Sequence, residues 1–235
     1  MLRFKYMSIF IMNCFSSLED AINAIHGGFA LGCRTFETHT DALGQQRQTT
    51  VWVLCGLPGV GKSTLADAIY RAYPPLRCRI ISRDNIRTDL IWQARKEDPK
   101  KEFSDLDQKV TKTVLQQIKQ VIKTRCCVGL VIDGCHTRFS DLLNLLQFLN
   151  GFLNQIQVNL LIVGNELSDC NHGISNKKEG DYSDYSTCGQ HNAVPYCVLA
   201  RKRKELAETL RVENLVQIFQ YVDTCMSVAG YRANK

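Results

Sequence analysis

Residues 56–63 read Gly56-Leu57-Pro58-Gly59-Val60-Gly61-Lys62-Ser63 and are the most informative stretch of this 235-residue sequence. They fit the pattern G-x-x-x-x-G-K-[ST], the P-loop or Walker A motif. The apolar run at 51–55 predicts a buried strand before the loop, and apolar residues at helical spacing predict a helix over 64–73. Strand, glycine-rich loop and helix in this order are the context that the motif requires, so we expect a nucleoside triphosphate to bind here.

Each part of the loop has a chemical role. Glycines let backbone N–H groups turn inward around an anion, and the N-terminus of the following helix adds its partial positive charge. We expect Lys62 to reach the β- and γ-phosphates and the hydroxyl of Ser63 to bind Mg²⁺. With ATP and Mg²⁺ as cofactors, the predicted binding set is Gly56, Leu57, Pro58, Gly59, Val60, Gly61, Lys62, Ser63 and Thr64.

Beyond the loop, the chain continues to alternate predicted strands and helices. This alternation predicts an α/β fold of the P-loop NTPase type, an open and mostly parallel sheet flanked by helices, with ligands at the carboxyl ends of the strands. Residues 49–235 are expected to form this domain, and residues 1–48, with one short predicted helix at 17–25, an extension of unknown role. Strands are predicted at 51–55, 77–81, 128–133 and 158–163, and helices at 64–73, 110–122, 140–152, 195–210 and 213–228.

The composition is that of a soluble globular protein, because 45% of residues are apolar, 22% are charged and no apolar run approaches the ~20 residues of a membrane span. The first fifteen residues faintly resemble a signal peptide but lack a small-residue cleavage site, so we expect a cytoplasmic protein. The eleven cysteines are scattered and odd in number, which favours reduced, buried thiols over a disulfide framework.

Positive charge is concentrated next to the P-loop. Residues 71–125 hold fourteen Lys and Arg against seven Asp and Glu, an excess of +7. Such a basic stretch beside a phosphate site suits a polyanionic partner such as nucleic acid. A solvated helix face would explain any single one of these lysines equally well.

Two further groups of residues are candidates for catalysis. Asp84 follows the second predicted strand and could accept a proton from an attacking hydroxyl, while Arg87, one helical turn on, could hold a phosphate. The alternative is a helix-capping aspartate with an exposed arginine. Asp133 ends the strand at 128–133, where a carboxylate belongs beside the magnesium or in its water shell. The alternative there is a simple Asp-Gly turn.

Taken together, these motifs resemble a known family. The P-loop through Thr64, the segment Ser82-Arg83-Asp84-Asn85-Ile86-Arg87 and the segment Ile132-Asp133-Gly134-Cys135-His136 look like the kinase domain of bacteriophage polynucleotide 5′-kinases over about residues 50–210. The resemblance implies that Asp84 is the general base toward a 5′-hydroxyl and that Arg87 works beside it. The family's third motif commonly reads Asp-x-Thr-Asn, so Cys135 and His136 depart from it on the acceptor side.

The polar segment at about 164–193 is expected to form a lid. Related kinases carry an arginine just before a Val-Pro pair, and Val194-Pro195 fits that pair without the arginine; Lys177, Lys178 or Arg201 would substitute. The run 201–204 is an alternative nucleic-acid contact or a solvated helix face. Four soft ligands within this segment are a candidate zinc site, although the chain is rich in cysteine throughout: Cys170, His172, Cys188 and His191.

The leading functional hypothesis is transfer of the γ-phosphate of ATP to a nucleic-acid hydroxyl, as in a polynucleotide 5′-hydroxyl kinase, with Asp84, Arg87 and Lys62 as catalytic residues and Ser63 and Asp133 at the metal. A close alternative is a kinase of 5-hydroxymethyluracil in phage DNA modification. Small-molecule or nucleoside kinases use similar motifs. More distant alternatives are a GTPase switch, echoed by residues 176–179, and a non-catalytic nucleotide-binding module.

Overall fold

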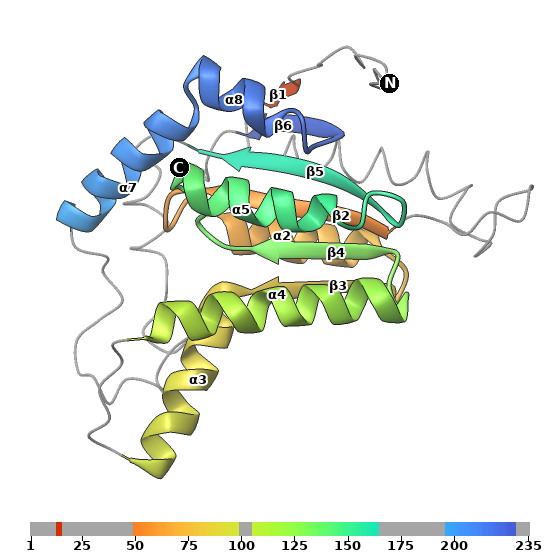
Figure 1. Cartoon of the computed structure of the whole chain (residues 1–235), viewed down its shortest axis with the longest axis vertical. Coiled ribbons are helices and arrows are strands. Elements are labelled where there is room, and N and C mark those ends of the chain that lie inside the picture. The colour runs from red at the N-terminus through yellow and green to blue at the C-terminus, as the bar shows by residue number, and fades with distance from the viewer. Residues whose placement is uncertain (1–12, 16–48, 99–104, 165–195, 229–235) are drawn as a thin grey trace, which may run out of the picture.

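A single six-stranded sheet organises the part of the chain that the computed structural model describes, residues 13–15, 49–98, 105–164 and 196–228 (Figure 1). Its strand order is β1-β6-β5-β2-β4-β3, and every described pair of strands is parallel. The expected open, parallel α/β sheet is thereby confirmed. The strands are β1 (Asn13–Phe15), β2 (Thr49–Gly56), β3 (Cys78–Ser82), β4 (Gly129–Asp133), β5 (Ile156–Val163) and β6 (Thr224–Val228).

Helices cover both faces of this sheet. Right-handed crossovers that run in opposite directions along a sheet place their helices on opposite faces. Figure 1 accordingly shows α2 behind the sheet and α4 and α5 in front, and α7 and α8 pack with α5. The helices are α2 (Lys62–Ala72), α3 (Arg83–Glu97), α4 (Leu106–Thr124), α5 (Phe139–Asn150), α7 (Tyr196–Thr209) and α8 (Val212–Ile218).

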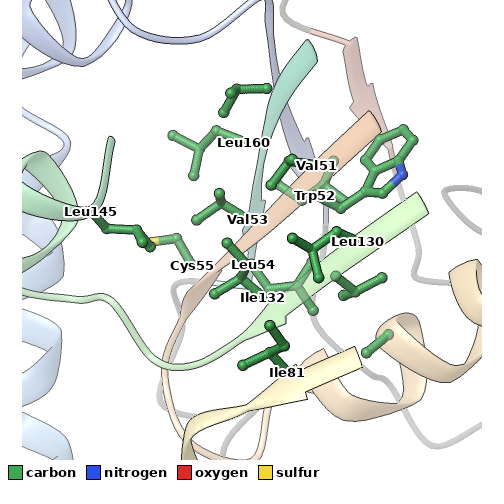
Figure 2. Packing of buried hydrophobic residues seen from close by; sticks show 14 of the residues in the cluster. Val51, Trp52, Val53, Leu54, Cys55, Ile81, Leu130, Ile132, Leu145 and Leu160 are labelled. Atoms are coloured by element: carbon green, nitrogen blue, oxygen red, sulfur yellow. The ribbon is translucent and has the colours of Figure 1, made fainter. Parts of the chain in front are cut away.

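The core is centred on β2, which lies between β4 and β5. Because both faces of these strands are covered, they read as continuous apolar runs rather than alternating ones. Figure 2 shows Val53, Leu54 and Ile132 among the buried residues of this cluster. Also on β2, Trp52 Nε1 donates a hydrogen bond of 3.0 Å to the hydroxyl of Tyr73.

Three segments differ from the sequence prediction, and the first is α3 (Arg83–Glu97), a stretch for which no helix was predicted. The helix predicted over 213–228 is wrong in its second half, because α8 ends at Ile218 and residues 224–228 form β6. Pairing of β6 with β5 supplies hydrogen bonds from a distant part of the chain, which override the local helical spacing. In addition, Asn13–Phe15 of the N-terminal extension pairs with β6 at the edge of the sheet.

The described cysteines are free thiols, and Cys55, Cys78, Cys127 and Cys225 are buried as expected of small apolar side chains. Cys126 and Cys197 are exposed, and Cys135 is half-buried. Among the described residues, none of the helices combines the length and the apolar character that crossing a membrane requires.

Register places the candidate functional residues at one edge of the sheet. In the parallel ladder Ser82 pairs with Asp133, so α3 begins beside the end of β4. Gly56 pairs with Val163 at the same edge, where β2 enters the P-loop. The carboxyl ends of β2, β3 and β4 therefore meet where ligands bind in open α/β sheets.

Candidate active site

The P-loop joins β2 to α2 in the conformation of an anion cradle. Gly59 (φ 81°) and Gly61 (φ 94°) have left-handed backbone conformations that favour glycine. Gly61 is the N-cap of α2 and provides no side-chain cap, so the first-turn N–H groups stay available to a ligand. Beneath the loop, Leu57 and Val60 are completely buried and fix its path.

Lys62 is buried within this cradle. Lys62 is the first residue of α2 and is only 7% exposed. The ammonium Nζ donates a hydrogen bond of 2.6 Å to the backbone carbonyl of Leu57. A buried ammonium has a strong preference for anionic partners, so a phosphate that enters the loop would find a cation already in position.

Ser63 and Asp133 meet directly at the floor of the site. Ser63 Oγ donates a hydrogen bond of 3.0 Å to Asp133 Oδ2, and Asp133 is 8% exposed. Burial raises the pKa of the Asp133 carboxyl, against the lowering effects of the Lys62 charge and the Ser63 hydrogen bond. No group of three or more protein ligands for a metal occurs among the described residues. One carboxylate and one hydroxyl nevertheless fit Mg²⁺, which takes most of its ligands from water and phosphates.

A network of charged residues forms the rim next to this floor. Ser82 caps α3 by accepting a hydrogen bond of 3.4 Å from the Asn85 N–H, which places Asp84 in the first turn. Arg87 bridges two carboxylates, at 3.1 Å from Asp84 Oδ1 and 2.7 Å from Asp107 Oδ1. The Asp84 side chain is 75% exposed, yet its charge lies close enough to raise the pKa of Asp133.

Asp107 is a member of this network that the sequence did not indicate. It lies in the first turn of α4, twenty residues beyond Arg87, and no local pattern relates the two. The hydrogen bond from Arg87, together with the charges of Arg87 and Arg83, holds the pKa of Asp107 below its ordinary value despite some burial. Asp107 therefore fixes the guanidinium of Arg87 at the rim of the site.

The loop at residues 134–138 runs from β4 to α5 and packs against the P-loop strand. Gly56 donates its N–H to the Cys135 carbonyl at 2.9 Å, and the Cys55 thiol donates to the His136 carbonyl at 3.2 Å. His136 has a left-handed backbone conformation (φ 43°), and its Nε2 is buried without a hydrogen-bond partner among the described residues. Burial and then the charges of Arg83 and Lys62 lower the pKa of His136 to about 3, so the ring is neutral at pH 7.

The same loop is fastened to α7 by Glu205. Glu205 accepts hydrogen bonds from the Thr137 hydroxyl at 3.0 Å and from Lys202 at 2.8 Å, and it pairs with Arg138 at 3.4 Å. Thr209 adds a buried hydrogen bond of 2.7 Å to the Thr137 carbonyl. Burial alone would raise the pKa of Glu205, but these hydrogen bonds and charges hold it below its ordinary value.

The structure brings most of the predicted site residues to one edge: the P-loop and Asp133 form the floor, and Asp84 and Arg87 lie on the rim. Arg201 is exposed on α7. The remaining predictions lie outside the described residues. These are the lid at about 164–193 with Lys177 and Lys178, the Val194-Pro195 pair, and the zinc candidates Cys170, His172, Cys188 and His191.

Comparison with known proteins adds the family. A protein-family model described as an AAA domain matches residues 51–184, which is more than half of the chain. The chain belongs to this AAA domain family. No curated protein matches the sequence.

Two of the similar solved structures share the fold of this AAA domain at low sequence identity. One, from the PezAT chromosomal toxin–antitoxin system of Streptococcus pneumoniae, is 15% identical with a TM-score of 0.51, covering 88% of this chain and 78% of its own. The AvrRxo1-ORF1:AvrRxo1-ORF2 complex is 14% identical with a TM-score of 0.50, covering 92% and 64%. The tunicamycin resistance protein of Deinococcus radiodurans is 16% identical with a TM-score of 0.45, covering 76% and 97%. Together with the P-loop geometry, the family identifies a nucleotide-binding AAA domain with a P-loop, kinase-like fold.

Proposed function

We propose that this AAA domain transfers the γ-phosphate of ATP to a hydroxyl group on a nucleic acid, most specifically the 5′-hydroxyl of a polynucleotide. The observation that carries the proposal is the position of Asp84. This exposed carboxylate follows β3 at the same sheet edge as the P-loop, is paired with Arg87 at 3.1 Å, and lies near the buried carboxylate of Asp133.

The reaction needs a base for the acceptor and cations for the phosphates. The acceptor oxygen attacks the γ-phosphorus, its proton passes to Asp84, and the bond between the γ-phosphorus and the bridging oxygen of ADP breaks. Lys62 stabilises the charge on the β- and γ-phosphates, and Arg87 stabilises the transferring group. Magnesium, held through Ser63 and Asp133, would neutralise charge on the phosphates. Asp107 positions Arg87 through an ion pair of 2.7 Å.

Surface charge supports nucleic acid as the acceptor. The helix α4 leads away from the rim network and exposes Lys109, Lys112, Lys119 and Lys123. Between residues 108 and 128 the sequence contains no Asp or Glu. Beyond Asp107 in its first turn, α4 therefore combines several lysines with no carboxylate, which gives a local positive potential that attracts a phosphate backbone.

A second candidate acceptor is the hydroxymethyl group of a modified base such as 5-hydroxymethyluracil. The observation in its favour is the loop at 134–138. There Cys135 and His136 stand in place of the Thr-Asn of the polynucleotide 5′-kinase motif Asp-x-Thr-Asn, and His136 Nε2 is buried without a hydrogen-bond partner among the described residues. A neutral imidazole has one hydrogen-bond donor and one acceptor, and these could bind polar groups of a modified base, which are not part of a terminal 5′-hydroxyl.

The test is a transfer assay with γ-labelled ATP and Mg²⁺, in which a 5′-hydroxyl oligonucleotide, DNA that contains hydroxymethyluracil and free nucleosides are offered in parallel. Label at the oligonucleotide end supports the proposal, label on internal bases selects the second candidate, and label on nucleosides alone contradicts both.

A substitution tests the role of the base. Asp84→Asn should lower kcat by about 10²–10⁴-fold and leave the KM for ATP unchanged. Asp89→Asn is the matched control, because Asp89 is exposed on the same helix. Equal activity of the two variants would exclude Asp84 as the base.

A further inference from the structure

Trp92 on α3 is an exposed large aromatic residue. It is 54% exposed, whereas Trp52, the other tryptophan of the sequence, is buried and hydrogen-bonded to Tyr73. Figure 1 shows α3 projecting from the β3 edge of the sheet, away from the other strands. Tryptophan on such a surface is unusual, because its large apolar area favours burial, and it is enriched where proteins bind partners.

The surroundings of Trp92 are polar and, on balance, cationic. Lys96 lies one turn further along α3 and holds its ammonium over the indole ring, 5.5 Å from the ring centroid. Of the other residues one turn away, Arg95 is cationic, Asp89 is anionic and Thr88 is neutral. An aromatic ring accompanied by Lys and Arg is the combination that binds single-stranded nucleic acid, with the ring stacking on a base and the cations contacting phosphates.

The position of Trp92 relates it to the proposed reaction. Trp92 and Asp84 are on the same helix, eight residues apart, which corresponds to roughly 12 Å along the axis. At about 3.4 Å per stacked nucleotide, that distance corresponds to three or four nucleotides. A strand whose terminal hydroxyl lies at Asp84 can therefore reach Trp92 with a nearby base.

We propose that Trp92 is a stacking platform for a nucleobase of the acceptor strand, a few nucleotides from the reacting hydroxyl, with Lys96 beside the adjoining phosphate. This inference rests on the proposed function, since it names the part of the acceptor that the protein holds away from the chemistry. The platform recognises a base by its aromatic face, so it tolerates any sequence. It makes a polynucleotide a better acceptor than a single nucleotide.

Steady-state kinetics with acceptors of two lengths test this proposal. Trp92→Ala should raise the KM for a long 5′-hydroxyl oligonucleotide by about 5- to 150-fold, with kcat unchanged, because one stacked base is lost. The KM for a dinucleotide should change by no more than about two-fold, as for an ordinary surface substitution. Trp92→Phe, which keeps an aromatic face, should recover most of the affinity. Tyr70→Ala is the matched control, because Tyr70 is an exposed aromatic residue on α2.

Fluorescence gives a reading that does not depend on catalysis. Without ATP, a long oligonucleotide should quench the emission of Trp92 and leave the emission of the buried Trp52, and Trp92→Phe should abolish the quenching. If the wild-type protein transfers phosphate but Trp92→Ala matches Tyr70→Ala in KM, the platform is refuted and the proposed function stands. If no nucleic acid is phosphorylated, quenching by the oligonucleotide still decides whether the platform exists. Quenching that depends on protein concentration alone would assign Trp92 to self-association and refute the proposal.

Discussion

Lys62 allows the two roles of a buried cation, in the fold and in binding, to be separated. We consider Lys62→Met, which keeps the length of the side chain and removes its charge. Lys62 is only 7% exposed, and its ammonium donates a hydrogen bond of 2.6 Å to the Leu57 carbonyl. Lys62 forms no ion pair among the described residues, and an ammonium kept out of water without one carries a desolvation cost that the apolar Met side chain does not. The free energy of unfolding of the variant without nucleotide should therefore equal or exceed that of the wild type.

Nucleotide binding should change in the opposite direction. A hydrogen bond from a charged group contributes about 1.5–3 kcal/mol, so loss of Lys62 should weaken ATP binding by about 10- to 150-fold. With Mg²⁺-ATP at a hundred times the wild-type Kd, the wild type gains about 2.7 kcal/mol, which is about 5–11 °C in Tm for a chain of this size. The variant gains only about 0.3–1.4 kcal/mol under the same conditions, between a tenth and a half of the wild-type shift.

Scanning calorimetry with and without Mg²⁺-ATP measures both quantities in one experiment. Lys119→Met is the control, because Lys119 is exposed on α4 and should alter neither quantity. A variant that loses Tm without nucleotide but keeps the full ATP-induced shift would refute the reasoning. In that case Lys62 would support the loop through Leu57 rather than bind phosphate.

Two further predictions concern the loop at 134–138. A Cβ at position 134 would lie 2.7 Å from His136 Nε2, so Gly134→Ala should cost about 1–3 kcal/mol in urea unfolding. In a double-mutant cycle, the combination with His136→Ala should cost less than the sum of the single changes, and strict additivity would contradict the contact. Glu205→Gln should cost about 1–3 kcal/mol at neutral pH, whereas Glu208→Gln, whose ion pair with Arg211 is exposed, should cost no more than about 1 kcal/mol. Because the folded-state pKa of Glu205 lies below its ordinary value of 4.5, its contribution is complete above that pH and is lost as the pH falls through the lowered pKa. A Glu205→Gln deficit that grows on acidification would contradict this assignment.

The elements that the sequence predicted correctly are those with strong local signals. The apolar run in β2, the glycines of the P-loop and the helical spacing in α4 each act over neighbouring residues, and each appears where it was expected. The segment 213–228 shows the limit of this approach. Leu215, Ile218 and Val222 have helical spacing, but β6 exists because β5 offers it a hydrogen-bonding edge.

Some contacts of the candidate site could likewise be predicted from the sequence, and others could not. The hydrogen bond between Ser63 and Asp133 could be anticipated, because each residue ends or follows a strand of the same sheet. Asp107 and Glu205 could not, since they reach the site from helices far along the chain, 20 residues from Arg87 and 68 from Thr137. No periodicity or motif reports contacts at such separations.

The strand order also has a consequence for biosynthesis. β2 is a largely apolar central strand and is made early, yet its partners are β4 and β5, which begin at Gly129 and Ile156. A nascent chain therefore carries an unpaired, aggregation-prone segment while many further residues are translated, and β5 has its second neighbour only once residues 224–228 have emerged. Pairings this distant in sequence carry a large loop-closure entropy, so we expect slow folding and a requirement for chaperones that shield β2 during synthesis.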